Sequence, residues 1–349
     1  MRVLITGGAG FIGSHTADRL LELGYQVRVM DSYETPVHPK GMVPSYLDSR
    51  IERSHGSVTC KDWLLAAMKN CDVILHLAAF QDYLPQFSKF VDVNVSSTAR
   101  IYELIVKHNL PIKKIVVASS QAAMGEGLYK TKTGRKVFPN MRLEEDLKNG
   151  IWEPKGPKGM KWAPSDETVS NPQNPYGMSK IAEEMFALHL GKRYNIPTVA
   201  LRYSIVQGSR QSFYNAYSGA CRIFSLAFHQ GNEPPIYEDG EQIRDFVNIH
   251  DVVDANILTM ENSRADYEVF NVGGGKVITV KDFAKVVADV YGRTDYEPVA
   301  CGRYRFGDTR HIFSDISKLK RLGWEPKRTV QDSVVEYKEW LDSAGSVDN

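Results

Sequence analysis

The feature that most constrains the fold is a glycine-rich loop that follows a short apolar segment. Residues 2–6 form a β-branched, strand-like run, and the sequence then reads Gly7-Gly-Ala-Gly-Phe-Ile-Gly13, in which Gly8, Gly10 and Gly13 satisfy the pattern GxGxxG. An amphipathic stretch with helical spacing comes next. Glycines between a strand and a helix permit a tight turn, let the backbone approach a pyrophosphate and leave the N–H groups of the helix N-terminus free to bind it. We therefore predict a dinucleotide-binding βαβ unit.

The next predicted strand, residues 26–30, is followed by Asp31 and Ser32. A carboxylate about 20 residues beyond the glycines is the group that holds the adenosine ribose hydroxyls in dinucleotide-binding units. The same charge repels a 2′-phosphate, and neither Ser32 nor Tyr33 supplies a cation to offset that repulsion. The sequence therefore favours NAD over NADP as the cofactor.

Apolar β-branched runs alternate with longer helical patterns through the first half of the chain, which is typical of a parallel sheet. The predicted fold class is α/β: a Rossmann-type, doubly wound parallel sheet with a smaller C-terminal α/β substrate-binding domain. We expect the NAD-binding domain to span residues 1–204, with segments near 245–272 returning to it, and the substrate-binding domain to comprise residues 205–244 and 273–341. Strands are predicted at residues 2–6, 26–30, 72–78, 115–120, 198–203, 245–249 and 269–272, and helices at residues 12–23, 93–109, 176–194, 252–260, 280–291 and 330–340.

One segment, residues 126–166, interrupts this alternation because it is long, polar and rich in Gly, Pro and Lys. Loops longer than about 12–15 residues are usually either functional or disordered. Two interpretations stay open: a structured flap near the active site and a passive surface insertion. Trp152 and Trp162 favour the flap, because exposed tryptophan is uncommon in a passive loop.

The charge balance restricts the partners of the protein. The 349 residues contain 43 Lys and Arg against 42 Asp and Glu, a formal net charge of +1. A domain that binds nucleic acid through a broad positive field usually has a clear basic excess, so no nucleic-acid partner is expected. A small anionic ligand remains compatible, since it needs only a few well-placed cations.

The four cysteines, Cys60, Cys71, Cys221 and Cys301, form no CxxC pair and have no histidine-rich neighbourhood. That scatter is typical of free thiols in a reducing compartment and predicts no metal site. No apolar run approaches the roughly 18 residues that span a bilayer, and the first residues lead directly into the predicted strand rather than a signal peptide. We therefore expect a cytoplasmic protein without a membrane partner.

Two later motifs carry groups suited to proton transfer. The predicted strand 115–120 ends in Ser119 and Ser120, at the edge where open α/β sheets bind ligands. Tyr176 and Lys180 are four residues apart on a predicted helix, so their side chains share one face. A nearby ammonium and an oxidised nicotinamide favour the phenolate of a tyrosine, whose ordinary pKa is about 10. We predict that Tyr176 is the base, that Lys180 tunes it, and that Ser120 orients the substrate oxygen.

In these motifs and their order the sequence resembles the extended short-chain dehydrogenases/reductases, in particular the NAD-dependent nucleotide-sugar epimerase/dehydratase family. The resemblance covers nearly the whole chain, and the insertion and residues 211–219 most resemble the dTDP-L-rhamnose 4-epimerase-like branch. The motifs that carry it are Gly7-Gly-Ala-Gly-Phe-Ile-Gly13, His76-Leu-Ala-Ala79, Asn94, Ser119-Ser120, Tyr176-Gly-Met-Ser-Lys180, Leu201-Arg-Tyr203, Arg244-Asp-Phe-Val-Asn-Ile-His-Asp251, Asn271-Val-Gly-Gly274 and Arg305-Phe-Gly-Asp308.

The resemblance implies roles for further residues. Arg244 and Arg305 would hold the diphosphate of a nucleoside-diphosphate sugar, with Asp308 near the nucleotide, and arginine suits phosphate because it binds phosphate oxygens in pairs. Gln81 and Ser120 would also contact the substrate, whereas His76 is expected to be a packed residue at a strand end rather than a catalyst. The residues expected to contact NAD are Gly7, Gly10, Phe11, Ile12, Gly13, Asp31, Ser32, Leu77, Ala78, Ala79, Asn94, Ser119, Tyr176, Lys180 and Tyr203.

The resemblance also implies a reaction, the epimerisation of a nucleotide-linked hexose, with C4 as the expected carbon and a transient 4-keto sugar as intermediate. Gln121 and Ala122 stand where dehydratases of the family carry an Asp-Glu pair, so the acids that drive water elimination are missing. Met124 and Ile205 replace a tyrosine and a substrate-contacting asparagine that are usual in the family. The insertion contains none of the cysteine pairs present in some relatives, so no metal is predicted there.

Two alternatives stay open beside the epimerase. One is a nucleotide-sugar dehydrogenase or reductase with net redox turnover. The other is a catalytically silent dinucleotide-binding protein, against which the complete set of Ser120, Tyr176 and Lys180 argues. Related enzymes often dimerise through two helices per subunit, here near residues 93–109 and 176–194, so a homodimer is expected.

Overall fold

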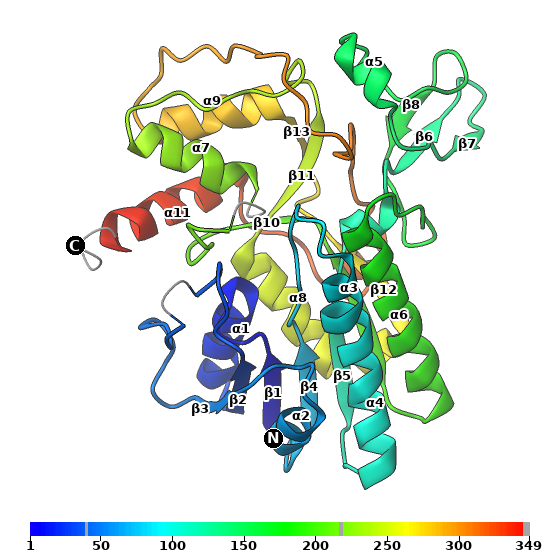
Figure 1. Cartoon of the computed structure of the whole chain (residues 1–349), viewed down its shortest axis with the longest axis vertical. Coiled ribbons are helices and arrows are strands. Elements are labelled where there is room, and N and C mark those ends of the chain that lie inside the picture. The colour runs from blue at the N-terminus through cyan, green and yellow to red at the C-terminus, as the bar shows by residue number, and fades with distance from the viewer. Residues whose placement is uncertain (39–40, 216–218, 345–349) are drawn as a thin grey trace.

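The computed structural model describes residues 1–38, 41–215 and 219–344 of the chain. Its largest element is a central seven-stranded sheet (Figure 1). A three-stranded sheet organises a smaller C-terminal part, and another three-stranded sheet lies within the insertion.

All neighbouring strands of the central sheet run parallel, in the order β12-β9-β5-β4-β1-β2-β3. From β1 the chain moves through β2 to β3 at one edge, then crosses to β4 and continues to β12 at the other edge. Ligands of open α/β sheets bind at such a switch point, beyond the carboxyl ends of the strands. The predicted Rossmann-type sheet is thus confirmed. Its strands are β1 (Arg2–Thr6), β2 (Gln26–Asp31), β3 (Glu52–His55), β4 (Val73–His76), β5 (Lys114–Ser120), β9 (Thr198–Tyr203) and β12 (Glu268–Val272).

Alternate residues of the central strands enter two separate apolar cores. Val3 and Ile5 of β1 join the core beneath α1 and α8, whereas Leu4 joins the core beneath α2, α4 and α6. A strand covered on both faces must be apolar at almost every position, which explains why these strands are visible in the sequence as continuous apolar runs. The covering helices are α1 (Phe11–Glu22), α2 (Lys61–Met68), α4 (Ser97–His108), α6 (Pro175–Arg193) and α8 (Ile249–Glu261).

The smaller part is built on the strands β10 (Ile205–Gln207), β11 (Ile243–Asn248) and β13 (Val277–Thr279). Its core is aromatic, with the rings of Phe246 and Phe283 4.4 Å apart. The strand predicted at 245–249 is therefore part of this small sheet, and the chain returns to the central sheet only with α8 and β12. The remaining helices of the C-terminal half are α7 (Ala220–His229), α9 (Val280–Val290), α10 (Ser317–Lys320) and α11 (Val330–Ala344), with a 3₁₀ turn at Ser263–Ala265.

The insertion has its own secondary structure. Strands β7 (Lys136–Val137), β6 (Leu128–Lys130) and β8 (Lys161–Ala163) form an antiparallel sheet in that order, and α5 (Glu144–Lys148) lies between β7 and β8. The backbone N–H of Ser165 donates to the carbonyl of Phe313 at 2.8 Å. The insertion is therefore a folded element joined to the C-terminal segment rather than a free loop.

The helix predicted at residues 93–109 is not a regular α-helix over its first four residues. A short α3 (Phe87–Phe90) runs into a π-helical stretch, Val91–Ser96, before α4 begins at Ser97. Such stretches change the direction of side chains and occur often at functional sites. Asn94, one of the residues expected to contact NAD, lies within it.

Leu75 tests the packing of the central sheet, because its side chain is fully buried (0% exposed) within β4. We expect Leu75→Ala to lower the free energy of unfolding by about 2–5 kcal/mol, since it removes apolar contacts and leaves a cavity. The control Leu143→Ala acts on a side chain that is 55% exposed and should change the stability by less than about 0.5 kcal/mol. Chemical denaturation followed by circular dichroism measures both, and equal losses would contradict the packing described.

Candidate active site

A cavity of about 1200 Å³ lies between the carboxyl ends of the central strands and the smaller part. It exceeds the roughly 300–1,000 Å³ of an ordinary small-molecule site, so it has room for more than one ligand. Of the residues predicted to form the site, Lys180 and Asn94 do not line the cavity. Those that do are Gly7, Gly10, Phe11, Ile12, Gly13, Asp31, Ser32, Leu77, Ala78, Ala79, Gln81, Ser119, Ser120, Tyr176, Tyr203, Arg244, Arg305 and Asp308.

The glycine turn is packed too closely to accept side chains. A Cβ on Gly13 would lie 2.3 Å from the carbonyl oxygen of Gly7, and a Cβ on Gly7 would lie 2.7 Å from the backbone of Ala78. Gly7 also has a φ of +68°, which favours glycine. The turn leads directly into α1, and the first residues of this helix line the cavity. This cradle fits the pyrophosphate of a dinucleotide.

Asp31 is held beside that turn at the end of β2. Its carboxylate accepts hydrogen bonds from the backbone N–H groups of Ala9 and Tyr33, both at 3.0 Å. The nearest ring nitrogen of the buried His38 is 3.8 Å away, and burial lowers the pKa of that histidine although Asp31 opposes the shift. His38 is therefore neutral at physiological pH and does not cancel the charge of Asp31, which fits a ribose with a free 2′-hydroxyl.

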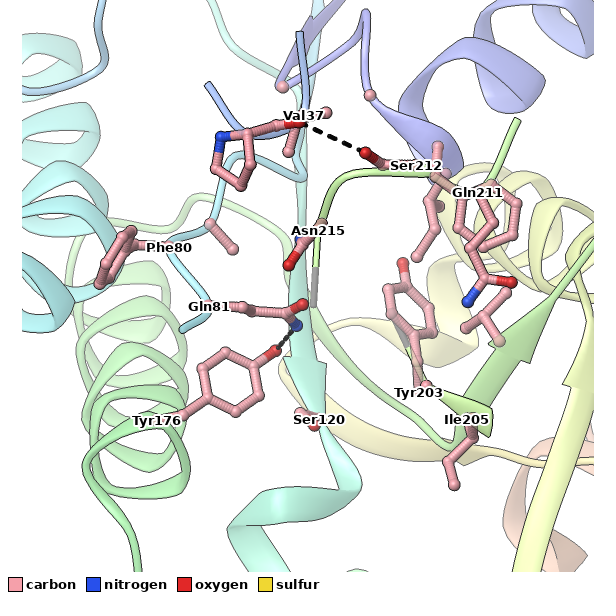
Figure 2. A pocket seen from close by; sticks show the side chains of 18 of the residues that line it. Val37, Phe80, Gln81, Ser120, Tyr176, Tyr203, Ile205, Gln211, Ser212 and Asn215 are labelled. Atoms are coloured by element: carbon pink, nitrogen blue, oxygen red, sulfur yellow. Dashed lines mark hydrogen bonds between the residues drawn. The ribbon is translucent and has the colours of Figure 1, made fainter. Parts of the chain in front are cut away.

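Tyr176, Gln81 and Ser120 meet in the same region of the cavity (Figure 2). Asn174 caps α6 by accepting from the N–H of Gly177 at 2.8 Å, and this places Tyr176 in the first turn of the helix. The Tyr176 hydroxyl accepts a hydrogen bond from the side-chain amide of Gln81. The Ser120 hydroxyl oxygen accepts from the N–H of Ala122 at 3.1 Å, which leaves its proton available to a ligand.

Lys180 lies below this group, inside the protein. Its ammonium donates to the carbonyl of Ala118 at 2.7 Å and to the carboxylate of Glu183 at 2.6 Å, and it lies 5.9 Å from the centre of the Tyr176 ring. Burial alone lowers the pKa of Lys180, but the charges of Glu183 and Tyr176 outweigh burial and raise it. Burial raises the pKa of Glu183 to about 7 even though Lys180 opposes the shift.

Sequence reasoning missed Glu183. The only signal was its position three residues after Lys180, a spacing at which helical side chains meet. Pairs at this spacing are common on exposed helices, and only the structure shows that both side chains are buried, with 0–1% exposed.

Asn94 supports the loop that follows β4 rather than lining the cavity. Its side chain accepts from the N–H of Phe80 at 2.7 Å and donates to the carbonyl of Phe80 at 3.1 Å and to the hydroxyl of Ser179 at 2.8 Å. His76 at the end of β4 is fully buried between Thr6 and Ser97, at 2.7 and 2.9 Å. Burial lowers the pKa of His76 to about 3, so it is a neutral, packed histidine.

Ser119 and Tyr203 line the cavity, but their hydroxyl groups are bound elsewhere. Ser119 donates to Glu184, which is buried and paired with Arg202 at 2.7 Å. The Tyr203 hydroxyl donates to the side chain of Asn256 at 2.6 Å. A bound dinucleotide could therefore contact the other atoms of these two residues, but not through a hydrogen bond donated by either hydroxyl.

Two arginines face the cavity from the smaller part. Arg244 on β11 donates to the backbone carbonyls of Thr309 and Arg310, both at 3.0 Å. The Arg305 guanidinium stacks 4.2 Å from the centre of the Tyr83 ring, donates to the Tyr83 hydroxyl at 2.7 Å and lies 3.5 Å from the Asp308 carboxylate. The two arginines predicted to bind a diphosphate thus line the same cavity as the glycine turn.

Segments distant in sequence meet over the cavity. Ser212 donates to the carbonyl of Pro36 at 3.5 Å (Figure 2). Lys89 of α3 lies 3.4 Å from Glu34. Loop contacts of this kind depend on tertiary structure alone. Of the stretch 211–219 singled out by resemblance, residues 216–218 lie outside the described part of the chain.

Within the described ranges no helix is long and apolar enough to cross a membrane. Among the same residues, no three or more His, Cys, Asp or Glu side chains gather in a way that could hold a metal ion. Cys60, Cys71, Cys221 and Cys301 are free thiols.

Comparison with known proteins agrees with this geometry. The model of the NAD dependent epimerase/dehydratase family matches residues 3–148 and 149–273. A dTDP-L-rhamnose 4-epimerase from Burkholderia thailandensis is 33% identical to the chain, over 97% of the chain and 94% of that relative. The chain belongs to the NAD dependent epimerase/dehydratase family.

Two solved structures are similar to this family member over nearly its whole length. A UDP-glucose 4-epimerase from Thermotoga maritima, solved with UDP-glucose, has a TM-score of 0.81 and 30% identity, with 99% of each chain covered. A UDP-glucose 4-epimerase from Thermus thermophilus, solved in complex with NAD, has a TM-score of 0.79 and 25% identity over 99% of this chain and 100% of the other. The cofactor of the family member is NAD, which the glycine turn and Asp31 fit.

Asp31→Asn tests the cofactor end of the site. The amide keeps one acceptor oxygen but loses the charge that favours ribose hydroxyls and repels a 2′-phosphate. We expect the NAD affinity to fall by about tenfold, which is about 1.4 kcal/mol, and the preference for NAD over NADP to shrink. Calorimetric titration with both cofactors measures this, and Asp48→Asn, which removes a carboxylate paired with Arg50, is the control. An unchanged ratio of the two affinities would contradict the assignment.

Proposed function

We propose that this protein epimerises a nucleoside-diphosphate hexose at C4, with NAD as cofactor and a transient 4-keto sugar as intermediate. The observation that carries the proposal is the joining of three groups in one cavity: the glycine turn with Asp31, the pair Ser120 and Tyr176, and the arginines 244 and 305. The two related structures described above are named UDP-glucose 4-epimerases, which supports the same reaction class.

The chain's own residues divide the work of binding the cofactor. The N–H groups at the start of α1 would hold the pyrophosphate, and Asp31 would accept hydrogen bonds from the adenosine ribose. Leu77, Ala78 and Ala79, in the loop supported by Asn94, would border the nicotinamide side. When bound, NAD supplies a reversible acceptor for the hydride of the sugar carbon.

Tyr176 is the proposed base that takes the proton from the sugar hydroxyl. Three groups surround it: the side-chain amide of Gln81, which donates to the hydroxyl, the buried ammonium of Lys180, 5.9 Å from the ring centre, and the N-terminal turn of α6, in which the residue lies. Ser120 is proposed to donate to the same sugar oxygen and so align it with Tyr176. Once the sugar has turned over and the hydride has been returned to the opposite face of C4, Tyr176 would give the proton back to the sugar oxygen, so that the base ends the cycle as it began.

The substrate end is proposed to bind the diphosphate through Arg244 and Arg305. The walls beside Ser120 are formed by Gln121 and Ala122, so they provide no carboxyl group for the elimination of water. This favours epimerisation over dehydration. A reductase or dehydrogenase with net redox turnover is distinguished by steady release of reduced or oxidised cofactor.

Tyr176→Phe tests the proposed base. We expect it to lower kcat by about 10²–10⁴-fold, the range for loss of a general acid-base group, and to leave NAD binding intact. The assay incubates the protein with UDP- and dTDP-linked hexoses and separates the sugar epimers. Tyr194→Phe, at the exposed end of the same helix, is the matched control and should retain full activity. Full epimerase activity in the Tyr176 variant would refute the assignment.

We also propose that the protein is a homodimer whose interface includes α4 and α6, which pack against each other. Met178, Met185 and Phe186 lie on one side of α6 at spacings of seven and eight residues and are 44–58% exposed. An apolar face of this kind on a helix usually marks an interface.

Met185→Glu tests the interface. We expect the variant to sediment as a monomer, because a charge would be buried against the partner, whereas the wild type sediments as a dimer. Val299→Glu, at an apolar side chain that is 75% exposed elsewhere on the surface, should leave the mass unchanged. A wild-type monomer in sedimentation equilibrium would contradict the proposal.

The cellular location is proposed to be the cytoplasm. Four free thiols, two of them buried, suit a reducing compartment better than an oxidising one.

A further inference from the structure

A cluster of buried charges joins the insertion to the smaller part of the protein. The side chains of Glu126, Arg142, Glu238 and Arg310 are each exposed by 5% or less. Arg142, from the insertion, binds both carboxylate oxygens of Glu238 at 2.8 and 2.9 Å, and Arg310 reaches the same carboxylate at 3.1 Å. A paired, two-bond geometry of this kind is specific to arginine.

The same cluster holds the backbone of residues 308–310. The Asp308 carbonyl accepts from Arg142 at 2.8 Å, and the Arg310 N–H donates to Glu126 at 2.7 Å. Arg244 binds the next two carbonyls, those of Thr309 and Arg310. Two side chains of the insertion and one of β11 therefore hold three consecutive residues of a segment that borders the cavity.

This segment presents the groups proposed to meet the substrate. Asp308 donates its N–H to the carbonyl of Arg305 at 3.2 Å, and their side chains lie 3.5 Å apart. Glu238 also lines the cavity and has a φ of +54°, an uncommon conformation for a residue other than glycine. A residue in that conformation needs its surroundings to hold it, and Arg142 binds it directly.

We propose that Arg142 is a positioning residue for the diphosphate end of the substrate and that the insertion thereby completes the substrate site. The inference rests on the function proposed above. Arg142 does not line the cavity; it acts through the carbonyl of Asp308 and the carboxylate of Glu238. Its effect is to keep Arg305 and Asp308 in place, and with them the pocket opposite the glycine turn.

Arg142→Lys keeps the charge but loses the two-bond geometry. With NAD present, we expect the dissociation constants for UDP and dTDP, measured by calorimetry, to rise by about tenfold. The KM for the sugar substrate should rise with them, while kcat changes by less than about twofold, because Ser120 and Tyr176 are held by other elements. NAD affinity should stay at the wild-type value. Arg135→Lys, on the exposed hairpin of the same insertion, is the matched control.

A folded Arg142→Lys protein that binds both nucleotides as tightly as the wild type would overturn the inference and leave the proposed function standing. A wild type that binds none of UDP, dTDP, GDP and CDP would overturn both. If the lysine variant does not fold, Glu238→Gln takes its place, since it removes the charge that Arg142 holds. Weaker nucleotide binding with unchanged NAD affinity in that variant supports the inference, and unchanged nucleotide binding overturns it.

Discussion

The active site depends on how closely the glycine turn after β1 approaches the loop after β4. The Gly7 backbone lies so near Ala78 that a side chain at position 7 would overlap it, and Gly13 closes the turn from the other side. This contact brings the start of α1 and the loop of residues 77–79 to the same end of the sheet. The regions proposed to bind the pyrophosphate and the reactive part of the dinucleotide therefore arise from adjacent strands, at the point where the direction of winding reverses.

Buried charges set the positions of the other functional groups. Below the cavity, Lys180 is paired with Glu183, and Glu184 is paired with Arg202, so the ammonium proposed to tune Tyr176 lies among paired charges in the interior. Charges in a low-dielectric interior are costly unless each has a close partner, and this requirement makes their geometry well defined. The same reasoning applies at the far end of the cavity, where Arg142 and Arg310 share the carboxylate of Glu238.

The sequence predicted the elements whose patterns are local and missed those whose existence depends on pairing. The strands at residues 2–6 and 198–203 were placed at their true bounds because burial on both faces demands apolar residues throughout. β3 at the sheet edge reads Glu-Arg-Ser-His and is mostly exposed, so it carries no such pattern. That β11 joins the smaller sheet follows from its partners β10 and β13, which no local pattern reveals.

The candidate site shows the same division. The glycines, Asp31, Ser120 and Tyr176 were recognisable because their spacing reflects one strand or one helix. The hydrogen-bond partners of Lys180, Asn94 and Ser119 could not be recognised in the sequence. Several polar groups lie near each of them in the chain, and only the tertiary packing determines which one makes the bond. The contact between Arg142 and Glu238 joins residues 96 positions apart, and nothing in either segment points to the other.

The most direct test of the account follows the hydrogen on the reacting carbon. The protein is incubated with the C4-deuterated form of a nucleotide sugar that it converts, and the product epimer is analysed by NMR spectroscopy and mass spectrometry. If that hydrogen is removed and returned within the site, the epimer keeps its deuterium at C4 and no reduced cofactor accumulates. An epimer that has lost its deuterium to solvent would contradict the account.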